Sequence, residues 1–239
     1  MLLDGKNPVS AWIAFIFGTI AVLSTICVGI PQLVFLIKHK KTDKSVKYYT
    51  FWVFFIGVIG WMLIGSWDSS PQKMVGAAYA NMVCSIIFSF TLFFSYKYSQ
   101  NIKKRKTSYF VLIITLSISL FAIAFSLWGI LANKHFPPTL MRVFLIVFPF
   151  LTTTSFLPSA LQSFEQKKFG GMSKGMLFTL LFINTTWLLY WIALGFNRNE
   201  FNGDIIATII WQGISFIMYS GLAILVFIEK THKKRVQPY

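Results

Sequence analysis

Seven long apolar stretches dominate this chain and restrict it to a membrane fold. They lie at about 11–37, 48–67, 74–96, 109–132, 142–164, 175–196 and 205–228, and none contains Asp, Glu, Lys or His. A helix needs about 20 apolar residues to cross a bilayer, whereas the strands of a membrane barrel alternate polar and apolar residues over about 10 positions. The sequence therefore predicts an all-α integral membrane protein with seven transmembrane helices.

Composition and charge agree with a membrane setting. Of the 239 residues, 56% are hydrophobic and 12% are charged, which is too apolar for a water-soluble fold. The net charge of +15 lies in short loops between the apolar stretches, so we expect contact with membrane lipids and no nucleic-acid partner. Cys27 and Cys84 fall inside apolar stretches and the three histidines are scattered, so we expect no disulfide, metal site or cofactor.

The distribution of Lys and Arg predicts the orientation. With the N-terminus outside, 17 of the 22 basic residues fall in inner loops and the C-terminal tail, and five fall outside. Because cytoplasmic loops carry the excess of positive charge, we expect an outer N-terminus and a cytoplasmic C-terminus. The first stretch, 11–37, is too long for the core of a signal peptide and is expected to stay as a membrane helix. Abundant Phe, Ile and Lys favour an AT-rich genome and a bacterial plasma membrane.

Two parts of the chain follow the same plan. Each has a helix with a proline, a basic loop and a second helix with Trp four residues before Gly, first over Gly29–Gly65 and again over Phe156–Gly195. The matched pairs are Pro31 and Pro158, Ser45 and Ser173, and Trp61 and Trp191, at offsets of 127, 128 and 130. A third helix in each copy carries a carboxamide, Asn81 or Gln212. The sequence therefore predicts an internal duplication.

The fourth apolar stretch has a topological role in this plan. Three crossings leave the chain on the opposite side, so one extra crossing is needed before a second copy can insert in the same direction. We predict two parallel three-helix bundles plus a linker helix, a 3+1+3 arrangement. Its segments are a first repeat at 9–100, the linker helix and its loops at 101–140, a second repeat at 141–229 and a basic tail at 230–239.

These motifs resemble a known family. Pro31-Gln32, a basic loop with Lys44-Ser45 and Trp61-x-x-x-Gly65 resemble the PQ-loop proteins, and the whole chain resembles the SWEET sugar transporters of that MtN3/saliva clan. The second copy departs from the motif, with Pro158-Ser159 and with Gln162 one turn later. The second helices also lack the family's prolines, and a Trp stands in both copies. The resemblance implies a facilitative uniporter that works by alternating access, with a sugar as its solute.

The prolines and the nearby glutamines are candidates for a hinge or gate. They are Pro31, Gln32, Pro158, Gln162 and Pro149. Proline lacks an N–H and clashes with the preceding turn, so it weakens a helix and lets one part swing. Matching positions in two copies favour this hinge over static kinks. The glutamines either bond exposed backbone across a helix gap or face the lipid headgroups.

Carboxamides and indoles within the membrane are candidates for solute binding. They are Asn81, Gln212, Trp61 and Trp191, with Trp187 and Asn184 as second-rank candidates. A carboxamide offers two donors and an acceptor, and an indole face stacks on the apolar face of a sugar ring. The alternative is that these residues make helix-to-helix hydrogen bonds or belong to an interfacial belt.

The absence of charge in the apolar stretches favours downhill transport of a small neutral polar solute. A proton-coupled carrier usually keeps an ionisable residue in the membrane, and an enzyme needs a nucleophile with a base or paired carboxylates. We therefore do not expect an enzyme. Two alternatives are a PQ-loop carrier of an amino acid or a vitamin, and a receptor or adaptor that does not transport. Whether the chain forms a homo-oligomer is left open.

Overall fold

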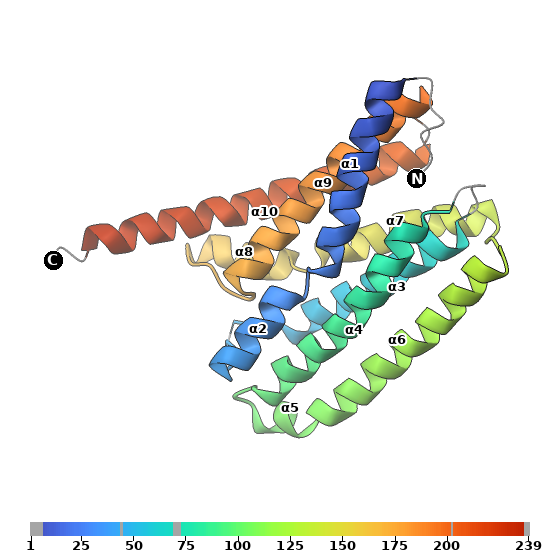
Figure 1. Ribbon diagram of the computed structural model, residues 1–239. Coiled ribbons are helices and arrows are strands. Elements are labelled where there is room, and N and C mark those ends of the chain that lie inside the picture. Colours follow the sequence, from blue (N-terminus) through green and yellow to red (C-terminus); the bar gives the residue numbers. More distant parts are fainter. Residues whose placement is uncertain (1–6, 44, 69–72, 202, 237–239) are drawn as a thin grey trace.

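The computed structural model describes residues 7–43, 45–68, 73–201 and 203–236 of the chain (Figure 1). All regular structure in these residues is helical, and seven spans are long and apolar enough to cross a membrane. The predicted all-α integral membrane fold with seven transmembrane helices is thereby confirmed. The helices are α1 (Pro8–Ile26), α2 (Ile30–His39), α3 (Tyr48–Trp67), α4 (Val75–Lys97), α5 (Ile102–Lys106), α6 (Ser108–Leu131), α7 (Pro138–Thr154), α8 (Leu157–Glu165), α9 (Lys174–Arg198) and α10 (Gly203–Val236).

The first and fifth spans are each broken into two helices. The breaks lie between α1 and α2 and between α7 and α8, whereas the sequence alone places kinks at Pro31 and Pro158. Both prolines instead lie in the first turn of the second helix, where the missing N–H would have no partner in any case. At the first break the Gly29 carbonyl accepts the Leu33 N–H of α2 at 3.0 Å, and the Thr91 hydroxyl of α4 lies 3.5 Å from the same carbonyl.

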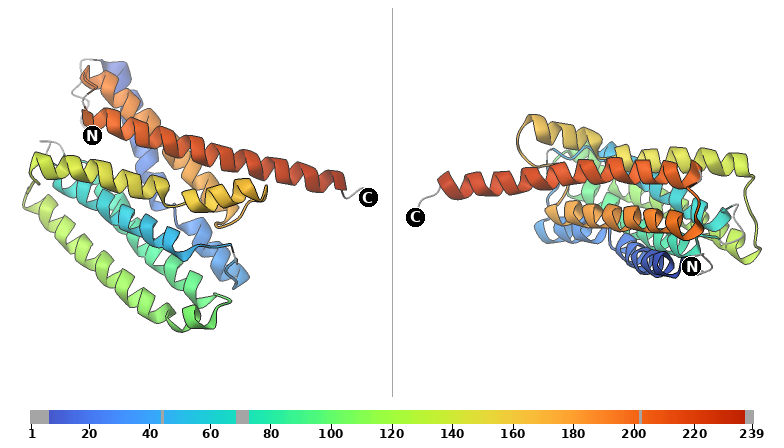
Figure 2. Two further views of the ribbon diagram at one scale, coloured as in Figure 1. Left: turned by 180° about the vertical axis from the view of Figure 1, so that it is seen from behind. Right: turned by 90° about the horizontal axis from the view of Figure 1, so that it is seen from above.

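The helices pair in the same order in both halves of the chain. In the first half α4 packs against α1, α2 and α3, and in the second half α10 packs against α7, α8 and α9. The halves meet through two reciprocal pairs, α1 with α9 and α3 with α7. The remaining long helix, α6, packs on α3 and α4 at one side of the molecule (Figures 1 and 2). This pairing supports the predicted arrangement of two bundles and a linker.

Some predicted segment limits differ from the helix bounds. The segment 101–140 holds α5 and α6, but its last three residues already belong to α7, which begins at Pro138. The segment 230–239 continues α10 as a helix to Val236, and residues 237–239 lie outside the described part of the chain. Among the basic residues used for the orientation, Lys6 and Lys44 also lie outside it.

A buried aromatic cluster lies between the two halves. The rings of Phe51 and Phe54 on α3 lie 5.2 and 5.4 Å from that of Phe156, the residue that precedes α8. Phe88 on α4 packs on Phe54 at 4.8 Å. Phe51, Phe88 and Phe156 are fully buried. Four aromatic rings therefore fill the space between the halves near the loops 40–47 and 166–173, which we call the basic side.

Polar contacts also join the two halves at the basic side, and we call them the latch. The carboxamide oxygen of Gln32 accepts the backbone N–H of Ser173 at 2.6 Å, and Gln32 is only 2% exposed. The other two bonds run from the Gly171 N–H to Ser45 Oγ at 2.9 Å and from Lys47 Nζ to the Pro158 carbonyl at 3.2 Å. At the opposite side, α1 and α9 lie apart from the ends of α3, α6 and α7 (Figures 1 and 2).

Candidate functional site

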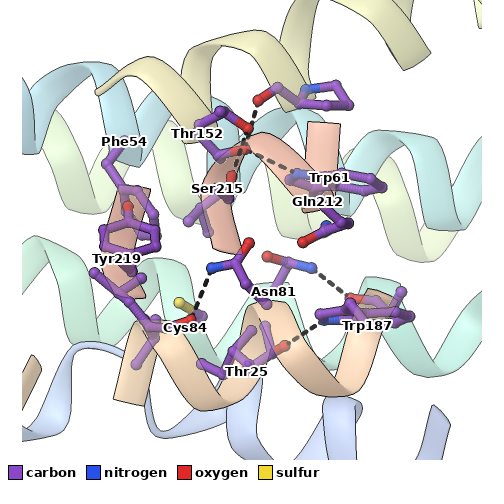
Figure 3. A pocket seen from close by; sticks show the side chains of 18 residues that line it. Thr25, Phe54, Trp61, Asn81, Cys84, Thr152, Trp187, Gln212, Ser215 and Tyr219 are labelled. Carbon is purple, nitrogen blue, oxygen red and sulfur yellow. Dashed lines mark hydrogen bonds between the residues drawn. The ribbon is translucent and has the colours of Figure 1, made fainter. Parts of the chain in front are cut away.

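A cavity lies between the two halves, beyond the aromatic cluster as seen from the basic side. It encloses about 710 Å³ of space free of protein atoms, its opening included. Side chains from α1, α3, α4, α7, α9 and α10 line it, three helices from each half, and among the described residues α6 contributes none. The side chains drawn in Figure 3 surround this space. Because both bundles contribute equally to its wall, the cavity would change shape if one half moved relative to the other.

Two asparagines in the cavity wall are held in one orientation. Asn81 Nδ2 donates to the Ala77 carbonyl at 2.8 Å, and Asn184 Nδ2 donates to the Leu180 carbonyl at 2.7 Å. Because a carbonyl can only accept, the amide nitrogen of each side chain must face it. Each asparagine thus keeps its Oδ1 atom as an acceptor without a hydrogen bond from any described residue, and both residues line the cavity.

Helix α10 adds two polar atoms that have no partner. Among the described residues, no hydrogen bond reaches Gln212 Oε1 or the Tyr219 hydroxyl, although both atoms are buried. They lie two turns apart on one face of α10 and both line the cavity (Figure 3). A buried polar atom without a partner costs about 1–3 kcal/mol, so these two atoms in the cavity wall are candidates for contact with a bound solute.

Two tryptophans make reciprocal contacts across the two halves. Trp61 on α3 donates its indole N–H to Thr152 on α7 at 3.4 Å, and Trp187 on α9 donates to Thr25 on α1 at 3.1 Å. One bond joins α3 of the first half to α7 of the second half, and the other joins α9 of the second half to α1 of the first half. The offsets, 126 for the tryptophans and 127 for the threonines, agree with the 127 of Pro31 and Pro158.

This register corrects one predicted pairing. The structural counterpart of Trp61 is Trp187, whereas the sequence reasoning matched Trp61 with Trp191 because both precede a glycine by four residues. Trp191 is not among the residues that line the cavity, and its ring stacks behind Trp187 at a centroid distance of 6.4 Å. The offset of 130 in that match lies further from the proline offset of 127 than the 126 of Trp61 and Trp187 does.

The other sequence candidates fall at three places. Asn81, Gln212, Trp61, Trp187 and Asn184 come together in the cavity, and Pro149 lines it from inside α7. Pro31, Gln32 and Pro158 lie at the basic side, where Gln32 bonds backbone across the helix gap and the Pro158 carbonyl accepts from Lys47. Gln162 lines a separate cavity at the basic side.

Sequence reasoning missed several residues of the cavity wall. Thr25 and Thr152 accept hydrogen bonds from the two indoles, and Cys84 and Tyr219 line the cavity from α4 and α10 (Figure 3). Thr25 and Thr152 precede Pro31 and Pro158 by six residues each, so the repeat could have identified them. Tyr219 offers no such signal, because its side chain is typical of a membrane helix.

The chemistry of the cavity is hydrogen bonding and stacking without charge. None of the described side chains that line it is ionised at neutral pH. No group of three His, Cys, Asp or Glu residues suited to a metal ion occurs in the described residues. The wall therefore combines amide and hydroxyl groups with two indole rings, which suits an uncharged polar molecule.

Comparison with solved structures identifies the fold. A eukaryotic SWEET transporter matches 90% of this chain and 97% of its own chain, with a TM-score of 0.51 and 14% sequence identity. No family model and no curated protein matches the sequence. The chain thus has a SWEET-like fold, as its motifs predicted.

Proposed function

We propose that the protein is a facilitative membrane transporter, a uniporter for a small neutral polar solute, with a sugar as the first candidate. The observation that carries this proposal is the uncharged polar cavity between two like-paired bundles. The similarity of the fold to a eukaryotic SWEET transporter supports it. We place the protein in the plasma membrane, with its N-terminus outside and the basic side in the cytoplasm.

The groups in the cavity suit a solute with several hydroxyl groups. The free acceptors are Asn81 Oδ1, Asn184 Oδ1 and Gln212 Oε1, and the Tyr219 hydroxyl can donate or accept. The faces of Trp61 and Trp187 offer stacking surfaces for the apolar face of a ring. An amino acid would bring a carboxylate and an ammonium group into a wall whose described residues hold no counter-charge, so this cavity favours a neutral solute over the amino acid alternative.

The latch and the helix breaks suggest how access alternates. Contacts between the halves close the basic side, so release of the solute to that side requires the latch bonds of Gln32, Ser45 and Lys47 to part. The breaks before Pro31 and Pro158 separate α2 from α1 and α8 from α7. We infer that α2 and α8 swing at these breaks while α1 and α7 stay packed against the opposite half.

Uptake into liposomes tests the proposed function. Purified protein is reconstituted, and uptake of labelled monosaccharides, disaccharides, polyols, vitamins and amino acids is measured without an ion gradient. We expect saturable uptake of a neutral sugar, and at least a tenfold loss in Asn81→Ala. Ser119→Ala, on the linker helix, is the matched control and should keep its flux. Failure to take up any neutral solute, or equal flux in Asn81→Ala, would reject the proposal.

A receptor or adaptor would behave differently in a second assay. The chain is shortened after Ile228, which removes the basic tail and the end of α10. A transporter should keep its flux because, among the described residues, none beyond Ile228 lines the cavity, whereas an adaptor should lose its partner.

A further inference from the structure

A second cavity lies at the basic side, apart from the central one. It encloses about 410 Å³ and shares no lining residue with the central cavity. Its walls come from the loop between α2 and α3, from α8 and from the loop between α8 and α9, so both halves build it. Ser, Gln, Asp and Lys side chains make up most of its wall, and Phe169 is the one aromatic residue among those described.

This cavity coincides with a departure from the internal repeat. In the first half Pro31 is followed by Gln32, whose carboxamide reaches the Ser173 N–H in the other half. In the second half Pro158 is followed by Ser159, which is too short for such a reach. The Ser159 hydroxyl is buried, with the residue 3% exposed, and it has no hydrogen-bond partner among the described residues. The space that a glutamine would fill is left open, with a polar atom at its edge.

The two glycines of the α8–α9 loop let the walls approach closely. A Cβ atom at Gly170 would lie 2.9 Å from Ser45 Oγ, and one at Gly171 would lie 2.8 Å from Ser159 Cβ. Gly171 also has a φ of +86°, a conformation that other residues rarely adopt. The Gly171 N–H is bonded to Ser45 Oγ, so the cavity is bounded by the latch itself.

Opposite charges face the cavity from the two halves. Asp43 lines it from the first half and Lys168 from the second, and no direct ion pair joins them among the described residues. Hydrogen bonds from the Ser45 backbone and hydroxyl hold the pKa of Asp43 below its usual value, and the positive charges of Lys168 and Lys41 act in the same direction. The carboxylate is therefore ionised at neutral pH. A ligand that carries both an ammonium and a carboxylate group can pair with both charges at once.

We propose that this basic-side cavity, between Asp43, Lys168 and Ser159, is a regulatory site for a small zwitterion of the amino acid class. The ammonium group of the ligand pairs with Asp43, and its carboxylate pairs with Lys168 and accepts from the Ser159 hydroxyl. Because the walls belong to different halves, the ligand binds only while the basic side is closed. It therefore stabilises the closed latch and slows exchange between the two conformations. Binding is independent of the proposed transport, whereas the effect on flux rests on it.

Titration calorimetry on the full chain in lipid nanodiscs tests the binding. The probes are L-serine, which carries both charges, ethanolamine, which lacks the carboxylate, and 3-hydroxypropionate, which lacks the ammonium. We expect saturable binding of L-serine, and binding at least tenfold weaker for the other two. Equal binding of all three, or no saturable binding of L-serine, would overturn the proposal.

Variants locate the site and separate it from the central cavity. Asp43→Asn and Lys168→Gln change exposed side chains, so they should fold normally and weaken L-serine binding at least tenfold. Ser159→Gln places in the second half the side chain that the first half has, and it should abolish binding by filling the space. Asn81→Ala should bind L-serine like the wild type even though it loses flux. Unchanged affinity in Lys168→Gln and Ser159→Gln would contradict the site.

Flux measurements then test the regulatory effect. L-serine supplied on the basic side of proteoliposomes should lower solute flux at least twofold in the wild type and leave Ser159→Gln unaffected. Equal inhibition of both proteins, or none in the wild type, would show that the ligand does not act through this cavity.

Discussion

Asn81 and Asn184 show how a single backbone contact sets the chemistry of a site. The side-chain amide nitrogen of each donates a hydrogen bond to the carbonyl four residues earlier in its own helix, which leaves the side-chain oxygen available to the cavity. The sequence could identify Asn81 because small residues surround it, and Asn184 because it lies on the same helix as Trp187. It could not show that the nitrogens are engaged, since a carboxamide offers donors and an acceptor equally.

The Tyr219 hydroxyl tests the idea that the cavity keeps polar atoms for its solute. Tyr219→Phe removes a buried atom that has no hydrogen-bond partner in the described part of the chain. We expect the free energy of unfolding to stay the same or rise by about 1 kcal/mol, and solute affinity to fall about tenfold. Tyr79→Phe, at an exposed position of α4, is the matched control. Thermal unfolding and equilibrium binding measure the two effects, and a destabilised variant with unchanged affinity would contradict this role.

The reciprocal indole bonds can be compared by double-mutant cycles. In Trp187→Phe with Thr25→Val we expect a coupling energy of about 1 kcal/mol, because this bond is short and buried. In Trp61→Phe with Thr152→Val we expect a smaller coupling, because the bond is 3.4 Å long. Chemical unfolding of the purified proteins measures both. A larger coupling for the Trp61 pair, or none for the Trp187 pair, would disagree with the observed geometry.

At the scale of elements, the helix breaks are where sequence and structure differ most. Proline predicted a disturbance in the first and fifth spans, but the breaks precede Pro31 and Pro158 because proline suits the first turn of a helix. Long apolar runs do not reveal such breaks, since their residues are apolar on both sides. The helix types and their order followed from length and apolarity, which depend little on neighbours.

The Gln32 bond is the element-scale contact that is easiest to remove. Gln32→Leu leaves the Ser173 N–H without its acceptor, so the start of α9 should open more often. We expect hydrogen exchange of the segment 171–176 to become at least tenfold faster. Gln162→Leu is the matched control, because within the described part of the chain the Gln162 side chain makes no hydrogen bond between the halves. Exchange that is equally slow in both variants would show that Gln32 does not hold the latch.

At the scale of the whole molecule, the pairing of α1 with α9 and α3 with α7 places equivalent residues on opposite sides of one cavity. The offset of Pro31 and Pro158 was enough to predict a duplication and a linker helix. It was not enough to place every residue, because the third helices are shifted further, with Asn81 and Gln212 at an offset of 131. Ser159 stands where the first copy has a glutamine, and the sequence alone does not show that this shorter side chain lies beside a cavity.

The native cysteines offer the most direct test of the central claim, that a transported solute occupies the cavity between the halves. Cys84 is buried and lines that cavity, whereas Cys27, in the break between α1 and α2, is exposed. Purified protein is treated with methylmercury, with and without the transported solute, and labelling of each cysteine is measured by mass spectrometry. We predict that the solute slows labelling of Cys84 at least fivefold and leaves Cys27 unchanged. Labelling of Cys84 that proceeds equally fast with saturating solute would contradict the account.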